Sequence, residues 1–333
     1  MRTLTIRAAM LCVVPLALVS QAYCAGLELP QDGWASWQVA AVEDAPDQCC
    51  WSSWDDRDPA RKSCRLDDDR NNFGSRDDAN TDAVRVYART AGGQVERLRA
   101  YSATCAVESA TPIRQLGIVT ADDSARWLIA QFKGGAAKND DLRENVLAAL
   151  AMHRGDVALD ALAAIARGDA SIGHRKPALF WLAVLRGAAG ADITSAVMFG
   201  STDVEVRKHA IFALTRSKAP RVVPDVIRLG NTDKSGDVRG QAWFWLAQTG
   251  AANADGAILA AIRNEDDEDV RDQATFALSQ LPAERATRAL VTVAEDRSMG
   301  REQRKRALFW LAQSEASGAQ TYLEKVLTGN GAD

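Results

Sequence analysis

The sequence predicts an all-α solenoid preceded by a small β-rich domain that disulfides hold together. Three observations lead to this fold class. A phenylalanine recurs at intervals of 32 or 33 residues in the C-terminal half of the chain, which is typical of stacked structural repeats. Ahead of the repeats, two short runs alternate apolar and polar residues, as β-strands do. Four cysteines also precede the repeats, which is typical of a small domain tied by disulfides.

Residues 1–22 have the composition of a secretory signal peptide. Two arginines flank the start of a 12-residue apolar run that ends at Val19, and small residues allow cleavage after Ala22 or as late as Ala25. The run is too short for a membrane span, which needs about 20 residues. No membrane span is expected elsewhere, so we expect the mature protein to be periplasmic or secreted.

The charge balance gives no reason to expect a nucleic-acid partner. The formal net charge is -4, and it becomes -6 when the two arginines of the signal are removed. The remainder has the composition of an ordinary soluble protein, with 47% hydrophobic and 25% charged residues.

The mature chain keeps four cysteines for the segment before the repeats, namely Cys49, Cys50, Cys64 and Cys105. An even number in an oxidising compartment predicts two disulfides. Neighbouring residues of an extended segment point to opposite sides, which favours separate partners for Cys49 and Cys50, namely Cys64 and Cys105. Zinc is the competing interpretation, which the exported context and the lack of a CxxC spacing disfavour.

We expect residues 26–119 to form a small β-rich domain that also caps the first repeat. The alternating runs 83–90 and 95–101 flank a Gly-Gly pair, which predicts a β-hairpin. Residues 34–42 could form another strand. The stretch 52–82 is dense in Asp, Arg, Asn and Ser, and we expect a long surface loop there, held by Cys64.

Residues 120–333 predict a solenoid of about six units with a terminal helix near residues 322–327. Each unit carries an arginine, an alanine three residues later, then a phenylalanine and a leucine at alternate positions. The alanine and the leucine are four residues apart, so they share the buried face of one helix. A second apolar run and a linker of small polar residues precede each phrase, so each unit is a pair of antiparallel helices. The phrases begin at Arg175, Arg207, Arg239, Arg271 and Arg304, with a weaker copy at Arg143.

An acidic residue stands two positions before the arginine in all copies but one. A carboxylate at this place suits the first turn of a helix, where free N–H groups and the helix dipole favour negative charge. The acidic residues are Asp141, Glu205, Asp237, Asp269 and Glu302.

The phrase resembles the HEAT-repeat family, in the short form found in phycobilisome-lyase-like HEAT proteins. The Asp-Val-Arg starts at 237–239 and 269–271 and the repeat length carry the resemblance, which covers about residues 120–330. It implies an α-α superhelix and leaves the function open, because the family is diverse.

The resemblance implies no enzyme activity and no cofactor. Deoxyhypusine hydroxylase, a HEAT-repeat enzyme, holds iron through His-Glu pairs, whereas His153, His174 and His209 of this chain are not followed by Glu. Only the repeat scaffold matches the lyase-like proteins, and the chain has no GxSxG, Walker or HExxH motif. We therefore expect a protein without catalytic residues.

The recurring phenylalanines are the candidate site. Each follows a buried alanine by two residues, which turns it by about 200° around the helix and away from the core. Exposed aromatic rings followed one turn later by amides could grip an extended peptide. Alternatively, the rings pack into the seams between neighbouring helices. The candidate residues are Phe180, Phe212, Phe244, Phe276 and Phe309, with Gln248, Gln280 and Gln313 one turn after the last three.

Two further ladders are expected to be structural. Trp181, Trp245 and Trp310 alternate with alanine at the equivalent positions, which predicts knob-and-gap packing in the core with a two-unit superperiod. The repeated arginines are expected to bind acidic side chains of the same or adjacent turns and tie the units together. A stripe that binds anions is the alternative.

A calcium site is a further candidate. Asp67, Asp69, Asn71 and Asp78 fall at positions 1, 3, 5 and 12 of an EF-hand count, but Asn72 stands where glycine is expected. The alternative is a solvated acidic loop that binds no metal ion.

We therefore expect an exported scaffold that binds another protein or peptide in the groove of its solenoid. Two alternatives stay open. One is a lyase-like or accessory protein that handles a small ligand, and the other is a calcium-stabilised N-terminal binding module with the solenoid as a spacer.

Overall fold

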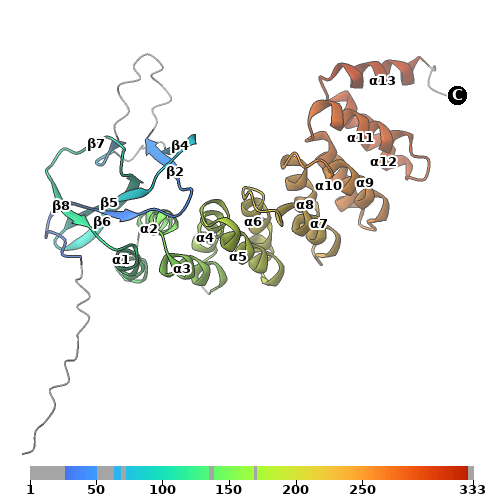
Figure 1. The fold of residues 1–333 in the computed structure, drawn as a ribbon. Helices are drawn as coiled ribbons and strands as arrows, with labels where there is room; N and C mark the ends of the chain where they lie inside the picture. Colours follow the sequence, from blue (N-terminus) through green and yellow to red (C-terminus); the bar gives the residue numbers. More distant parts are fainter. Residues whose placement is uncertain (1–26, 51–63, 69–72, 135–138, 169–170, 329–333) are drawn as a thin grey trace, which may run out of the picture.

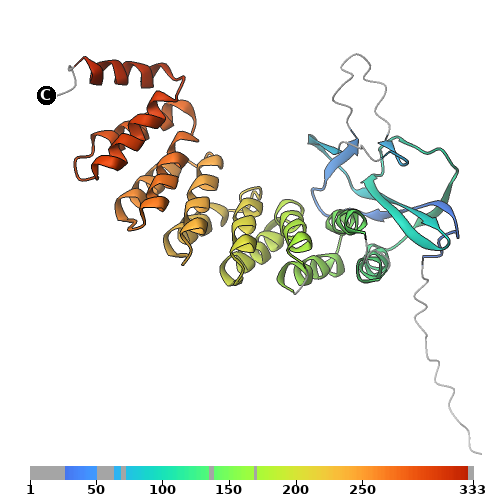
Figure 2. The same cartoon turned by 180° about the vertical axis from the view of Figure 1, so that it is seen from behind.

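A β-domain stands at one end of the molecule, and a bent helical solenoid leads away from it (Figures 1 and 2). The computed structural model describes residues 27–50, 64–68, 73–134, 139–168 and 171–328, and it leaves out the side chains of Cys50 and residues 73–79. The predicted signal peptide lies outside these residues. None of the helices in the described ranges is both long and apolar enough to cross a membrane.

The β-domain is built on a four-stranded sheet with the order β6-β5-β1-β8. β1 pairs antiparallel with β5 and parallel with β8, while β5 and β6 form a hairpin. Two small ladders, β2-β4 and β3-β7, lie beside it. The strands are β1 (Gly33–Ala40), β2 (Pro46–Cys50), β3 (Cys64–Arg65), β4 (Phe73–Asn80), β5 (Ala83–Ala91), β6 (Gln94–Ser102), β7 (Val107–Glu108) and β8 (Ile113–Ile118).

The predicted hairpin is confirmed. Ala91 pairs with Gln94, and the two residues between them have positive φ, 56° at Gly92 and 77° at Gly93. Two such residues form the tight turn whose twist matches that of the flanking strands, and glycine adopts this conformation without steric cost. The predicted first strand is confirmed as β1.

The prediction of a surface loop over residues 52–82 is wrong in part. β4 pairs with β2, and Cys64 and Leu66 are fully buried. The low apolar content misled the prediction, because a short strand can be held by backbone pairing and by a few buried side chains rather than by an apolar face.

One disulfide of the predicted pair is defined by the structure. Cys49 bonds Cys105, with 5.6 Å between their Cα atoms, and it links β2 to the segment after β6. Cys64 is also disulfide-bonded. The side chain of Cys50 lies outside the described part of the chain. The finding agrees with separate partners for the two adjacent cysteines and selects Cys105 for Cys49.

Alternate residues of the sheet serve two different cores. Trp37, Val86 and Leu98 face the helices and join the core of the solenoid. Trp34 and Tyr101 face the opposite way and form a second small cluster with Cys64 and Leu66. Because strand side chains alternate between faces, one sheet can close both clusters.

In the described ranges each phrase helix packs against the helix before it, which gives the pairs α1-α2, α3-α4, α5-α6, α7-α8, α9-α10 and α11-α12, and α13 follows the last pair. The helices α2, α4, α6, α8, α10 and α12 pack in one layer, and their partners form the other. Figure 1 shows α4, α6 and α8 on the inner side of the bend, above α5 and α7. The helices are α1 (Ala121–Lys133), α2 (Asp140–Met152), α3 (Asp156–Arg167), α4 (Ile172–Leu185), α5 (Gly187–Gly200), α6 (Val204–Leu214), α7 (Val222–Thr232), α8 (Gly236–Gln248), α9 (Ala254–Asn264), α10 (Glu268–Ser279), α11 (Ala283–Glu295), α12 (Arg301–Ala312) and α13 (Ser317–Leu327).

Each predicted acidic residue lies in the first turn of its helix. In three of the helices, a side chain two residues earlier caps the N–H groups, namely Asn139, Asp203 and Asp267. The predicted acids therefore act on the helix dipole, while their neighbours supply the hydrogen bonds.

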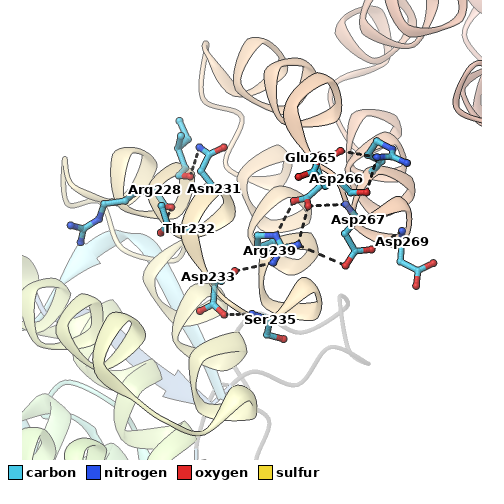
Figure 3. A network of polar contacts seen from close by, with 12 residues as sticks. Arg228, Asn231, Thr232, Asp233, Ser235, Arg239, Glu265, Asp266, Asp267 and Asp269 are labelled. Atoms are coloured by element: carbon cyan, nitrogen blue, oxygen red, sulfur yellow. Dashed lines mark hydrogen bonds and ion pairs between the residues drawn. The ribbon is translucent and has the colours of Figure 1, made fainter. Parts of the chain in front are cut away.

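Two repeat arginines bind acidic residues 26 positions later, as the ladder of arginines predicted. Arg207 donates through two nitrogens to both carboxylate oxygens of Asp233, at 2.8 and 2.9 Å. Arg239 binds Glu265 in the same way, at 2.8 and 2.9 Å, and also donates to the Asp233 carbonyl (Figure 3). The carboxylate of Asp233 also accepts the N–H of Ser235, so one acid ties two units and orders the next turn.

The contact between the β-domain and the solenoid contains a buried polar chain. Trp37 Nε1 donates to Ser124 Oγ (2.7 Å), which lies 2.8 Å from His153 Nε2, while His153 Nδ1 lies 2.6 Å from the Ala149 carbonyl. The carbonyl can only accept, so Nδ1 carries the proton and the Ser124 hydroxyl donates to Nε2. The guanidinium of Arg186 donates to the His153 carbonyl close by.

Burial lowers the pKa of His153 from 6.5 to about 4, because the ring is fully enclosed and the Arg186 charge adds to the effect. As pH falls, the unfolded chain binds this proton near pH 6.5 and the folded chain only near pH 4. The stability that His153 contributes is therefore complete above pH 6.5. It falls by about 3 kcal/mol as the pH drops from 6.5 to 4.

The expected test is urea unfolding of the wild type and of His153→Gln at pH 7 and pH 4.5. The carboxylates that also titrate are shared by both proteins, so the variant should lose less stability on acidification by about 2 kcal/mol. His209→Gln, at a half-buried ring whose pKa is also lowered by burial, should recover less of the loss than His153→Gln and serves for comparison. Equal losses in wild type and His153→Gln would contradict the assignment.

Removing Arg207 should cost more than removing Arg271. Arg207→Ala leaves the carboxylate of Asp233 buried without its partner and should lower the free energy of unfolding by about 3 kcal/mol. Arg271 donates to the Glu265 and Asp266 carbonyls, and its loss should cost about 1 kcal/mol. Chemical denaturation measures both, and equal costs would show that the buried ion pair adds nothing.

Candidate functional site

Aromatic side chains form one continuous ladder along the inner helix layer. Phe180 stacks on Phe212 with centroids 6.0 Å apart, and Phe244 stacks on Phe276 at 5.9 Å. Trp245 contacts both Phe212 and Phe244, at 4.9 and 5.0 Å, and so joins the two stacked pairs. The ladder continues from Phe276 to Trp310 and Phe309, and at its other end Phe180 contacts Trp181.

The ladder is neither fully exposed nor buried in the helix seams. The first four phenylalanines are partly buried, while Phe309 is 51% exposed. The two interpretations of the sequence, a groove-facing row and seam packing, thus describe different parts of each ring. One part rests on the neighbouring helix, and the other is exposed to solvent.

The tryptophans do not occupy the place predicted for them. Trp181, Trp245 and Trp310 are partly exposed members of the ladder, while the equivalent Ala213 and Ala277 are fully buried. The two-unit superperiod survives, because a stacked phenylalanine pair alternates with a tryptophan.

Trp243 on α8 packs against a small residue, which is the kind of contact that the sequence predicted for the three repeat tryptophans. It is fully buried, and a Cβ on Gly230 of α7 would stand 2.7 Å from its ring. The sequence contains a signal for this contact, since a tryptophan stands where the other phrases have Leu, Ile or Thr, and a glycine stands in the preceding helix.

Polar side chains border the ladder. The guanidinium of Arg216 lies over the rings of Phe212 and Trp245, 5.2 and 5.6 Å from their centroids. Gln248 and Gln313 are exposed at the ends of α8 and α12, whereas the amide of Gln280 donates to Ser279 Oγ. The two exposed amides can reach the backbone of a ligand, and Arg216 already binds a ring face.

A cleft opens where the ladder meets the β-domain. Its volume is about 820 Å³, and its walls come from β6 and β2 on one side and from α2 and α4 on the other. Phe180 and Trp181, the first rings of the ladder, line it. The sequence could not reveal this cleft, because it combines residues of the β-domain with residues of α2 and α4.

Acidic side chains stand on the rim of the cleft. Glu96, Asp141 and Glu144 are exposed and line it, and none of the ion pairs described for the chain includes them. Arg97 lines the same cleft but donates to the Leu66 carbonyl. Arg99 lines the cleft as well, so side chains of both charges lie beside its aromatic rings.

The calcium candidate is represented only by Asp67, since Asp69 and Asn71 and the side chain of Asp78 lie outside the described part of the chain. Both carboxylate oxygens of Asp67 are occupied. Oδ1 accepts from Trp34 Nε1 (3.0 Å), and Oδ2 accepts the Ala110 N–H (2.8 Å). These bonds lower the pKa of Asp67, the Ala110 bond most. The carboxylate therefore orders the loops of the β-domain, and the calcium site stays a prediction.

The histidines are separated and engaged in packing. His153 is sealed with Ser124, so this Ser-His pair cannot meet a substrate. His174 binds Ser171 and Asp140, and His209 lies 2.9 Å from the Lys176 carbonyl. Burial lowers the pKa of His209. One cluster in the described ranges has metal-like spacing, but the sulfurs of Cys49 and Cys105 in it form the disulfide.

This geometry defines a helical-repeat solenoid with an aromatic inner face and a β-domain at its first end. Residues 191–279 match the family model of HEAT repeats. No curated protein sequence matches the chain. A solved structure of human deoxyhypusine hydroxylase in complex with glycerol is similar at 19% identity, covering 60% of this chain and 76% of its own, with a TM-score of 0.33.

An inner ring and an end ring of the ladder should differ in their contribution to stability. Phe276→Ala removes a ring held between Phe244 and Trp310 and should lower the free energy of unfolding by about 2 kcal/mol. Phe309→Ala removes a ring that is half exposed and should cost below about 1 kcal/mol. Urea unfolding compares them, and equal costs would mean that the ladder is uniformly buried.

Proposed function

We propose that this protein is an exported scaffold that holds a segment of another protein along the aromatic ladder. HEAT repeats commonly mediate contacts between proteins, and residues 191–279 match them. The observation that carries the proposal is the ladder itself. Its rings join five successive helices without a break while part of each ring stays exposed.

A continuous row of partly exposed rings favours an elongated partner over a compact small molecule. Rings already held by their neighbours lose little conformational freedom when a ligand binds, which favours affinity. Aromatic residues also dominate the energetic centres of protein interfaces. The exposed amides of Gln248 and Gln313 beside the ladder fit the backbone groups of a polypeptide.

The extracellular or periplasmic location is part of the proposal. It is supported by the composition of residues 1–22 and by the disulfide between Cys49 and Cys105. Disulfides persist in oxidising compartments and are rare where thiols are kept reduced.

The test is partner capture from envelope extract by the mature oxidised protein. A protein retained by the wild type should be lost by the double variant Phe244→Ser/Phe276→Ser and weakened by Phe309→Ser, which removes the most exposed ring. Phe199→Ser changes a half-buried ring on α5, in the other helix layer, and is the matched control. Cooperative melting of each variant shows that the fold survives.

Retention by the wild type and Phe199→Ser alone supports the ladder as the binding surface. Equal retention by all four proteins would contradict it, because the rings would then contribute only to packing.

A further inference from the structure

The two stacked phenylalanine pairs of the ladder differ in the charges that surround them. Phe180 and Phe212 form the first pair. Lys176 and Lys208 stand one turn before them on the same helix faces. Both lysines pair with one carboxylate, that of Glu205, at 3.8 and 2.7 Å. Because two cations share one anion, this border of the first pair keeps a net positive charge.

The other border of the first pair carries cations without acidic partners. The guanidinium of Arg216 is exposed and lies over the rings of Phe212 and Trp245. Lys218 is exposed in the same loop. Within the part of the chain that the structure describes, neither side chain belongs to an ion pair. An exposed cation beside a row of rings favours a ligand that brings an acidic group.

The second stacked pair has no such excess of cations. Phe244 and Phe276 form this pair. Gly240 and Asp272 stand one turn before them, and the carboxylate of Asp272 pairs with Arg306. The ladder is therefore basic at α4 and α6 and lacks this positive charge at α8 and α10.

The spacing of the units selects a backbone conformation for an elongated ligand. Neighbouring helices of a packed layer have axes about 8–10 Å apart. A polyproline II helix advances about 9.3 Å in one turn of three residues, so every third side chain meets the next unit from the same side. A β-strand covers this distance in about three residues, which turns successive contacts to opposite faces. Of these two extended conformations, polyproline II alone repeats its contact at every unit.

The polar groups beside the ladder match a backbone that is rich in acceptors. Proline has no N–H, so a proline-rich segment offers carbonyl oxygens and few donors. The guanidinium of Arg216 can only donate, and the exposed amides of Gln248 and Gln313 supply further N–H groups. Proline-rich segments dock in grooves lined by aromatic rings, because their conformation is already ordered before they bind.

We propose that the ladder binds a proline-rich segment of the partner that also carries acidic residues, held in the polyproline II conformation. Each unit takes one turn of three residues, with a proline ring against the aromatic rings. The acidic side chains lie over the basic half of the ladder, where a carboxylate meets Arg216. This inference rests on the proposed function and gives the partner segment a chemistry and a conformation.

The test measures the fluorescence anisotropy of labelled peptides mixed with the mature oxidised protein at low salt. A peptide of five Pro-Pro-Glu triplets, one for each ladder helix from α4 to α12, should bind. Five Pro-Pro-Lys triplets keep the conformation and reverse the charge, so this peptide should bind about tenfold more weakly or worse. Five Ala-Ala-Glu triplets keep the charge and lose the ordered proline rings, and they should also bind about tenfold more weakly or worse.

Substitutions in the protein locate the binding surface. Arg216→Glu should weaken binding of the Pro-Pro-Glu peptide by about tenfold or more, because it reverses the charge that the peptide meets. Arg228→Glu is the matched control and should leave the affinity unchanged, since this exposed guanidinium covers the ring of Phe199 in the other helix layer. Phe244→Ser/Phe276→Ser should abolish binding while its thermal melting stays cooperative.

Each outcome separates this proposal from the proposed function. A comparison peptide that binds as tightly as the Pro-Pro-Glu peptide overturns the proposal, and so does equal weakening by Arg216→Glu and Arg228→Glu. No binding of the Pro-Pro-Glu peptide to the wild type also overturns it, but partner capture that depends on the ladder would leave the proposed function standing. Partner capture that survives Phe244→Ser/Phe276→Ser contradicts the proposed function, and this inference with it.

Discussion

A single helix pair of this chain cannot bury its own apolar face, and the whole structure follows from that constraint. Each pair closes the core of the one before it, so the apolar interior runs without interruption from Trp37 and Val86 in the sheet to Ala319 in the last helix. The β-domain solves the problem at the first end by laying one sheet face on the helices. At the other end α13 leaves Leu327 84% exposed.

Two sets of polar contacts border the same interior. At the domain junction, Trp37, Ser124 and His153 satisfy one another in sequence. Between units, Arg207 and Arg239 bind acids of the following turn, which places paired charges at the edge of the core rather than inside it. Rigid spacing of the helices results, and this spacing holds the aromatic rings in register.

The sequence predicted the elements whose signals are local, and missed the features that need two distant segments. The Gly92-Gly93 turn and the helix pairs follow from patterns within a few residues. The interval of 26 between Arg207 and Asp233 recurs between Arg239 and Glu265, and could have been found. The exposure of the phenylalanines could not have been predicted. Helix geometry places these side chains away from the buried face of their own helix, but it does not indicate how far a neighbouring helix covers them.

The N-terminal domain shows the same limit. The sequence of β4 is too polar to predict a strand. Its pairing with β2 depends on chain segments that the fold brings together. Sequence reasoning separated Cys49 from Cys50 but could not choose between their partners. The cleft could not be predicted for a related reason. Glu96 and Glu144 are 48 residues apart in the sequence, and they line the same cleft because β6 packs beside α2.

The alternation of stacked phenylalanine pairs with tryptophans makes the surface pattern of the inner face repeat every two units. With identical units it would repeat at every unit. A shift of one unit along the solenoid places Trp245 where the next unit has Ala277, so the surface does not coincide with itself. A shift of two units does restore the pattern. The proposed partner segment would therefore meet equivalent surroundings only at every second unit. The number of equivalent positions at which it can bind along the solenoid is then half of what identical units would offer.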